Sequence, residues 1–271
     1  MSDVKYGIVL PVYDIQTVIE YATDAEKAGW DGYFVADVAW GLDAWVCLTA
    51  AAARTKRIHL GTLLTPLSVM KPWKVAAQVA TLDQLAKGRV ILSVGMGAID
   101  VGFAQFGEAV DLKTRAERVD EALEIIGKLW HGEAFQHTGK HYQLDVQEGT
   151  AGMPAPVEIP VWMVAAWPRP KSMQRALRCD GVIPYIKPKG EGGRTPEPSD
   201  LQDITAWVRS QPGANKPQDY IIEGTTAGND EQSLEKIRRW RDVGMTWWIE
   251  SLWDVPHDQR VARLKQGPPR I

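Results

Sequence analysis

The 271-residue sequence has few cysteines and no long hydrophobic segment. Its two cysteines, Cys47 and Cys179, lie far apart in helix-like contexts, which indicates buried reduced thiols rather than a disulfide or a metal pair. No apolar run approaches the ~20 residues that cross a membrane, and the first residues lead directly into a predicted strand without a signal peptide. We therefore expect a cytoplasmic protein that does not enter a membrane.

Several common functional motifs are also missing. The sequence contains no GxGxxG after a first strand, no P-loop, no HExxH and no serine in a nucleophile elbow. Its five histidines show no spacing typical of a metal site. A net charge of −3 gives no electrostatic reason to expect nucleic acid as a partner. These absences remove the usual markers of nicotinamide binding, nucleotide hydrolysis, metal catalysis and serine hydrolysis.

A strand–helix–strand unit is the clearest pattern that the sequence does contain. Residues 57–66 and 88–97 are two nearly all-apolar strands, and a helix starting at about Pro72 lies between them. Strands that are apolar on both faces are buried on both faces, which is typical of a parallel sheet covered by helices. Both strands end in small or polar residues, and the C-terminal ends of parallel strands carry the chemistry in such folds.

The same alternation of strand and helix continues through the whole chain, and no Pro/Gly-rich linker divides it into two compact halves. This pattern predicts one (β/α)8 TIM barrel that spans residues 1–271. Two segments interrupt it: a small hairpin insertion at about 133–160, centred on Gly139, and a Pro/Gly-rich mobile loop at about 187–200, a candidate lid. The predicted strands are residues 6–11, 31–37, 57–66, 88–97, 161–166, 181–185, 220–226 and 246–251, and the predicted helices are 15–28, 43–54, the one from 72, 112–130, 170–178, 201–210, 230–242 and 255–266.

Two carboxylates near strand ends are candidate catalytic groups. Asp37 ends the second strand on the same face as Tyr33 and Val35, and it would either take part in the site or cap the following turn. Glu250 follows Trp248 in an apolar strand, so its charge must reach solvent, a partner or a ligand. Its two alternatives are a place at the barrel mouth and a structural ion pair.

The segment that joins the fifth strand to its helix is a candidate anion site. Small residues at Ala165 and Ala166 let backbone N–H groups approach a ligand, and Arg169 lies near the start of the helix. The alternative is an ordinary turn with solvated cations. A barrel mouth with an anion site and few polar groups fits a bound organic cofactor that supplies the reactivity itself.

Several segments combine into a pattern that is more specific than any one of them. They are residues 43–46 with 53–55, 58–66, 71–74, 82–95, 167–169 with 178–181, and 244–251 with 266–270. Together they resemble the bacterial luciferase-like family of flavin- or deazaflavin-dependent oxidoreductases, over nearly the whole chain.

The resemblance implies a flavin-type ring at the C-terminal mouth of the barrel, from either reduced FMN or the deazaflavin coenzyme F420, and no metal. In this family a bulge or a non-prolyl cis peptide after the third strand supports the ring, and here it would lie near Leu63. The cofactor phosphate would lie at residues 165–169. The family often forms dimers through its second and third helices, so we expect a homodimer. The residues implied in cofactor binding are Thr62, Leu63, Leu64, Gly95, Met96, Gly97, Ala165, Ala166, Trp167 and Arg169.

The first functional hypothesis is a luciferase-like monooxygenase that acts on a small organic substrate with reduced cofactor from a separate flavin or deazaflavin reductase. The second is a deazaflavin-dependent hydride-transfer reductase or dehydrogenase. Deazaflavin-linked sugar-phosphate dehydrogenases of the family carry Asp-His after strand two and Glu after strand four, whereas this chain has Asp37-Val38 and Gly97-Ala98. Because that histidine and glutamate are missing, a flavin-binding storage barrel without turnover is an alternative from another class. A further alternative is a barrel enzyme that acts on a phosphorylated metabolite without a redox cofactor.

Overall fold

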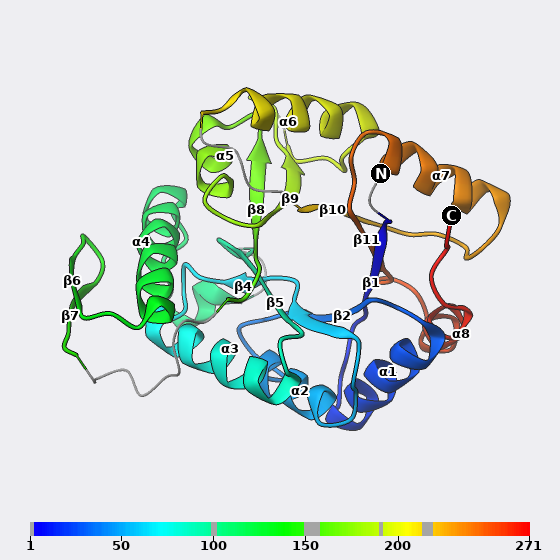
Figure 1. The fold of residues 1–271 in the computed structure, drawn as a ribbon, viewed down its shortest axis with the longest axis horizontal. Coiled ribbons are helices and arrows are strands. Elements are labelled where there is room, and N and C mark those ends of the chain that lie inside the picture. The colour runs from blue at the N-terminus through cyan, green and yellow to red at the C-terminus, as the bar shows by residue number, and fades with distance from the viewer. Residues whose placement is uncertain (1–2, 99–101, 149–157, 190–191, 213–218) are drawn as a thin grey trace.

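Helices surround a ring of parallel strands in this protein (Figure 1). The computed structural model describes residues 3–98, 102–148, 158–189, 192–212 and 219–271. The strands of the ring are β1 (Lys5–Val9), β2 (Gly32–Val35), β3 (His59–Thr62), β4 (Thr65–Pro66), β5 (Val90–Gly95), β8 (Val161–Trp167), β9 (Gly181–Ile186), β10 (Asp219–Gly224) and β11 (Trp247–Ser251). The helices are α1 (Ile15–Ala28), α2 (Ala44–Ala52), α3 (Pro72–Ala86), η1 (Phe103–Phe106, a 3-10 helix), α4 (Leu112–His131), α5 (Pro170–Ala176), α6 (Pro198–Ser210), α7 (Glu231–Asp242) and α8 (His257–Gln266).

The ring of strands is closed. Its nine strands follow the order β3-β2-β1-β11-β10-β9-β8-β5-β4, and the pairing of Leu60 with Val90 joins β3 to β5. Strands β3 and β4 are consecutive in the chain and both pair with β5, so they share one position in the ring. The barrel therefore has eight positions, and the predicted (β/α)8 fold is confirmed.

Local sequence explains where many of the helices begin and end. Two glycines follow α1 and α4 with φ angles of 87° and 78°, in the left-handed region that favours glycine. At helix starts, an aspartate side chain accepts backbone N–H bonds. These N-cap residues are Asp14 for α1, Asp43 for α2, Asp111 for α4 and Asp230 for α7.

Helix α6 begins earlier than predicted. It starts at Pro198, and the side chain of Asp200 accepts a hydrogen bond of 2.8 Å from the backbone N–H of Glu197. The predicted loop 187–200 therefore loses its last three residues to the first helical turn, a position where proline and aspartate are both favourable. Residues 190–191 of that loop lie outside the described residues.

Three aromatic side chains fill the barrel interior. Ring centroids lie 5.0 Å apart for Trp162 and Trp247 and 5.6 Å apart for Phe34 and Trp162. Glycines on neighbouring strands make room for them, because a Cβ on Gly7 would lie 2.7 Å from the Phe34 ring and one on Gly181 would lie 2.3 Å from Trp162. The interior is thus a packed core, and a ligand must bind above it at the mouth.

The side chain of Glu250 is fully buried between the barrel and α8. Because side chains alternate along a strand, Glu250 points to the opposite face from Trp247, which lies in the interior. Its carboxylate accepts bonds of 2.5 and 2.8 Å from the backbone N–H and hydroxyl of Thr226, and one of 2.9 Å from Trp248 Nε1. Arg263 Nη2 lies 3.3 Å away. Glu250 therefore forms a structural ion pair, and its predicted place at the mouth is wrong.

A hairpin packs against the outer side of α4, as Figure 1 shows. Strands β6 (Phe135–Thr138) and β7 (Gln143–Val146) are antiparallel. Glu121 of α4 accepts hydrogen bonds of 3.0–3.1 Å from the backbone N–H groups of residues 140–142. A Cβ on Gly139 would lie 2.1 Å from Glu121 Oε2, so the turn needs glycine to receive this carboxylate. The hairpin lies where it was predicted, and residues 149–157 of the predicted insertion lie outside the described residues.

Two predicted absences concern membrane-spanning helices and metal sites. No described helix combines the length and the apolar character needed to span a membrane. The described residues also contain no group of three His, Cys, Asp or Glu side chains placed to hold a metal ion. Cys47 and Cys179 are both buried thiols.

The buried ion pair gives a testable prediction about stability. Glu250→Gln leaves Arg263 buried without its counter-charge, so we expect the free energy of unfolding in urea to fall by about 3 kcal/mol. The matched control is Glu231→Gln, because Glu231 is exposed and pairs with Arg238 at 2.7 Å on the surface. We expect no measurable change in that variant. Equal stability of both variants and the parent protein would contradict the structural role of Glu250.

Candidate functional site

A chain of hydrogen bonds connects Asp37 to the barrel wall. Asp37 follows β2, and its Oδ2 lies 3.2 Å from the hydroxyl of Thr65 at the start of β4. The Thr65 hydroxyl lies 2.9 Å from that of Thr62, which ends β3. The Thr62 hydroxyl in turn lies 3.2 Å from the carbonyl oxygen of Ser93 on β5. Both threonines are fully buried, so this chain has its open end at Asp37.

The number of protons in this chain depends on the state of Asp37. Two hydroxyls carry two protons, but the chain contains three oxygen–oxygen contacts. An ionised Asp37 can only accept, which leaves one of the three contacts without a hydrogen. The Thr65 hydroxyl donates to the Asp37 carboxylate, and the Thr62 hydroxyl donates to the Ser93 carbonyl oxygen. Because an ionised Asp37 accepts the Thr65 hydrogen bond, this end of the chain stabilises the carboxylate.

Burial of Asp37 acts in the opposite direction from the Thr65 hydrogen bond and has the larger effect on its pKa. Burial raises the pKa of this carboxyl to about 6, the Thr65 hydrogen bond opposes the rise, and the nearby Asp43 carboxylate adds to it. A carboxyl with this pKa can gain and lose a proton near neutral pH, as a general acid or base must. The alternative role as a turn cap belongs to Asp43, whose side chain accepts the N–H bonds at the start of α2.

Apolar residues form a floor at the mouth next to this chain. A Cβ on Gly95 would lie 3.1 Å from Leu64 Cδ2 and 3.4 Å from Val164 Cβ, so these residues meet across three neighbouring strand positions. Leu63 packs against the interior cluster below. The peptide bond between Leu63 and Leu64 is cis, at the place where a distorted peptide was predicted. This floor is apolar, as the binding surface for the face of an organic ring usually is.

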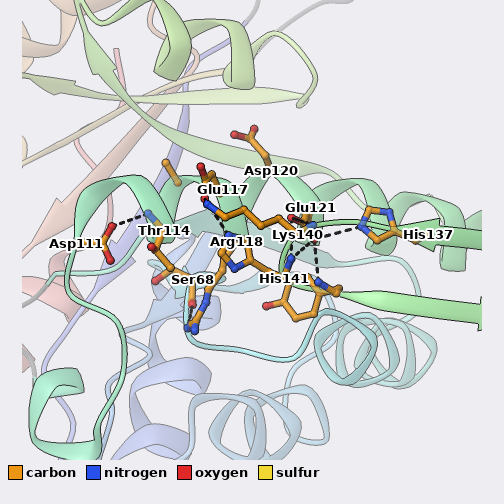
Figure 2. A network of polar contacts seen from close by, with 12 residues as sticks. Ser68, Asp111, Thr114, Glu117, Arg118, Asp120, Glu121, His137, Lys140 and His141 are labelled. Atoms are coloured by element: carbon orange, nitrogen blue, oxygen red, sulfur yellow. Dashed lines mark hydrogen bonds and ion pairs between the residues drawn. The ribbon is translucent and has the colours of Figure 1, made fainter.

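Helix α4 holds the loop that follows β5. The guanidinium of Arg115, which is 2% exposed, donates to the carbonyl oxygens of Met96 and Gly97. Ser68 donates a 2.7 Å bond to the same Met96 oxygen. Gly97 has a φ of 76°, and a Cβ there would lie 2.7 Å from Pro66. Figure 2 shows α4 reaching both Ser68 and the hairpin. Met96 and Gly97 are therefore fixed in position beside the floor.

Sequence reasoning missed Arg115, although a signal was present. In the predicted helix 112–130, position 115 lies four residues before Val119 and seven before Ala122, on the buried face. A charged residue on that face must find buried partners, and here these are backbone carbonyls at the strand exit.

The exit of β8 contributes less to the mouth than predicted. Ala165 is fully buried among the residues outside the barrel interior, and the Ala166 N–H donates a 2.9 Å bond to Ser172. Trp167 packs against Trp207, with ring centroids 6.2 Å apart. Arg169 donates a 3.0 Å bond to the Pro188 carbonyl, which places its charge near the ends of β8 and β9. The N–H of Ala166 is thus already used within the protein.

Glu223 is a second mouth residue that sequence reasoning missed. It shares a face of β10 with Ile221, which lies in the barrel interior. In the register of the sheet Glu223 lies beside Ile249, another interior residue. Trp253 Nε1 donates a 2.8 Å bond to its carboxylate. Because side chains alternate along a strand, Glu223 of β10 lies on the face that points into the barrel, whereas Glu250 of β11 lies on the face that points away from the interior.

A pocket of about 320 Å³ opens beside Asp37, and we name it the β2 pocket because the loop after β2 supplies most of its wall. The other residues come from the end of β4, from the turn that follows β4, from η1 and from the segment directly after η1. Its lining consists of residues 37–43, Pro66, Val69, Met70, Phe103, Phe106 and Glu108.

Comparisons with known proteins place the chain in a family. The model of a family described as luciferase-like monooxygenase matches residues 4–200. An F420-dependent glucose-6-phosphate dehydrogenase of Amycolatopsis mediterranei is 33% identical over 98% of this chain and 89% of the relative. A predicted coenzyme F420-dependent oxidoreductase of Mycobacterium tuberculosis is 31% identical over 70% of this chain, and the match spans 58% of that protein's length.

Solved structures agree on the fold. An F420-dependent secondary alcohol dehydrogenase, in complex with an F420–acetone adduct, has a TM-score of 0.80 at 18% identity and covers 99% of both chains. The F420-dependent tetrahydromethanopterin reductase of Methanopyrus kandleri has a TM-score of 0.77 at 17% identity and covers 98% of both. From the family model and the relative that spans nearly its whole length, this chain belongs to the luciferase-like monooxygenase family.

Proposed function

We propose that this protein is an F420-dependent oxidoreductase that acts on a small organic substrate, with Asp37 as the group that exchanges the substrate's proton. The observation that carries the proposal is the buried hydroxyl chain from Ser93 to Asp37, which opens at the mouth. The relatives described as F420-dependent support the choice of cofactor.

The residues at the mouth fit such a cofactor. Leu64, Gly95 and Val164 form an apolar floor that a larger residue at position 95 would disturb. Arg169 adds a positive charge near the ends of β8 and β9, where an anionic tail requires one. When bound, F420 supplies a two-electron hydride acceptor or donor.

Asp37 has a defined task in this proposal. In the direction that converts an alcohol to a carbonyl compound, the ionised carboxylate accepts the hydroxyl proton while the carbon loses a hydride. In the reverse direction the protonated carboxyl returns that proton to the carbonyl oxygen. The Thr65 hydroxyl donates its hydrogen bond to the ionised carboxylate and so stabilises the state that accepts the substrate's proton. The histidine and glutamate of the sugar-phosphate dehydrogenases are not needed for this transfer.

The monooxygenase with a separate reductase is the second candidate, because the same apolar floor accepts a flavin ring.

A homodimer through α2 and α3 also stays a prediction, and the exposed side chains of Val46, Trp73 and Leu85 on these helices support it. The predicted cytoplasmic location stays a prediction as well.

The proposed cofactor is tested by titrating the purified protein with F420 and with FMN, followed by cofactor fluorescence. We expect F420 to bind about tenfold more tightly or better. Gly95→Val pushes a side chain into the floor and should weaken F420 binding by about tenfold or more. Gly127→Ala on α4 is the control, because no atom lies within 4 Å of its added Cβ. Preference for FMN favours the monooxygenase, and binding of neither cofactor rejects both candidates.

Asp37→Asn separates activity from stability. We expect turnover to fall by about 100-fold or more while F420 affinity stays the same, because the amide cannot exchange the proton. The folded-state pKa of Asp37 lies above that of an unfolded chain, so its ionisation costs stability as pH rises from 4 to 6. The variant should therefore be more stable than the parent by about 2 kcal/mol at pH 8 and equally stable at pH 4. Full activity with unchanged stability contradicts the role of Asp37.

Thr65→Val tests the hydroxyl chain through the pH profile. In the oxidising direction kcat/KM should rise with pH through about 6 as Asp37 ionises. Loss of the Thr65 hydrogen bond raises the pKa of Asp37, so the midpoint should move up by about one pH unit. Thr81→Val is the control, since its hydroxyl bonds only the Ala77 carbonyl on the exposed side of α3. A midpoint that does not move in Thr65→Val removes the chain from the mechanism.

A further inference from the structure

The charge of the β2 pocket has one sign. Among the described residues that line it, none is lysine, arginine or histidine, and three are carboxylates, Asp37, Asp43 and Glu108. Asp43 is engaged, because it accepts two backbone N–H bonds of 2.9 Å at the start of α2. Glu108 is engaged as well, because its carboxylate lies 3.2 Å from the guanidinium of Arg118. Among the three lining carboxylates, Asp37 is therefore the one available to contact a ligand.

The rest of the lining is apolar, and part of it is exposed to solvent. Trp40 and Phe106 expose 83% and 60% of their surface, although side chains of this size usually bury most of it. The loops that carry them approach closely, since a Cβ on Gly102 would lie 3.7 Å from Ala39 Cβ and 3.9 Å from the Phe106 ring. Val38 is also exposed. Two aromatic rings on adjacent loops suit an apolar ring as ligand.

We propose that the β2 pocket selects a neutral, ring-bearing alcohol or ketone and rejects phosphorylated sugars. The ring lies against Trp40 and Phe106, and the polar oxygen points to Asp37. A phosphate dianion in the same pocket would meet carboxylates with no lining cation to pair with, which weakens binding by about tenfold or more for each close repulsion. This substrate class deepens the proposed function and rests on it for the reaction, but the binding preference can be measured without cofactor.

The experiment compares two probes with the same ring, 2-naphthol and 2-naphthyl phosphate, by calorimetric titration of the full chain. We expect 2-naphthol to bind at least about 100-fold more tightly than its phosphate ester. Trp40→Ala should weaken 2-naphthol binding by about tenfold or more. Trp73→Ala is the matched control, because Trp73 is a partly exposed tryptophan of α3 outside the pocket, and it should bind 2-naphthol as the parent does. Asp37→Asn removes one of the repelling carboxylates, so it should reduce the difference in affinity between 2-naphthol and 2-naphthyl phosphate.

Three results overturn the inference: equal or tighter binding of 2-naphthyl phosphate, unchanged 2-naphthol affinity in Trp40→Ala, or no binding of 2-naphthol at any soluble concentration. The outcome is separate from that of the cofactor titration. If F420 fails to bind but 2-naphthol shows the expected preference, the proposed function fails and the pocket assignment stands. If F420 binds and the phosphate ester is preferred, only the substrate class fails.

Discussion

Strand β5 pairs first with β3 and then with β4, and the candidate site depends on the break between these two partners. The break brings the hydroxyls of Thr62 and Thr65 to 2.9 Å from each other and places Leu64 over Gly95. One irregular strand position thus supplies both the apolar floor and the polar wall of the mouth. Asp37 reaches the same wall from β2 through its bond to Thr65.

Helix α4 makes this arrangement rigid, because different faces of it hold different parts of the mouth. Arg115 binds the carbonyls of Met96 and Gly97 after β5. Asp120 binds Arg175 of α5 at 2.7 Å, which fixes the helix that follows β8. Charged groups that are paired or hydrogen-bonded in a buried setting hold geometry well, because losing one partner leaves the other uncompensated.

The sequence was sufficient to predict the barrel, its strands and the position of Asp37, because buried parallel strands and helix caps leave strong local patterns. It was not sufficient to assign Glu250. Both faces of a barrel strand are apolar, so the pattern around Trp247 and Trp248 does not show which tryptophan points inward. The raised pKa of Asp37 and the carbonyl partners of Arg115 also depend on contacts between distant segments, which no local pattern contains.

The proposed mechanism requires that Asp37, whose pKa is raised by burial and which accepts the Thr65 hydrogen bond, exchanges a proton near neutral pH. The most direct test is a carbon-13 NMR titration of the aspartate carboxyl carbons in the parent protein, with Asp37 assigned from the signal missing in Asp37→Asn. We expect a titration midpoint for Asp37 near pH 6. A midpoint near 4, the value of an ordinary solvent-exposed aspartate, would contradict it.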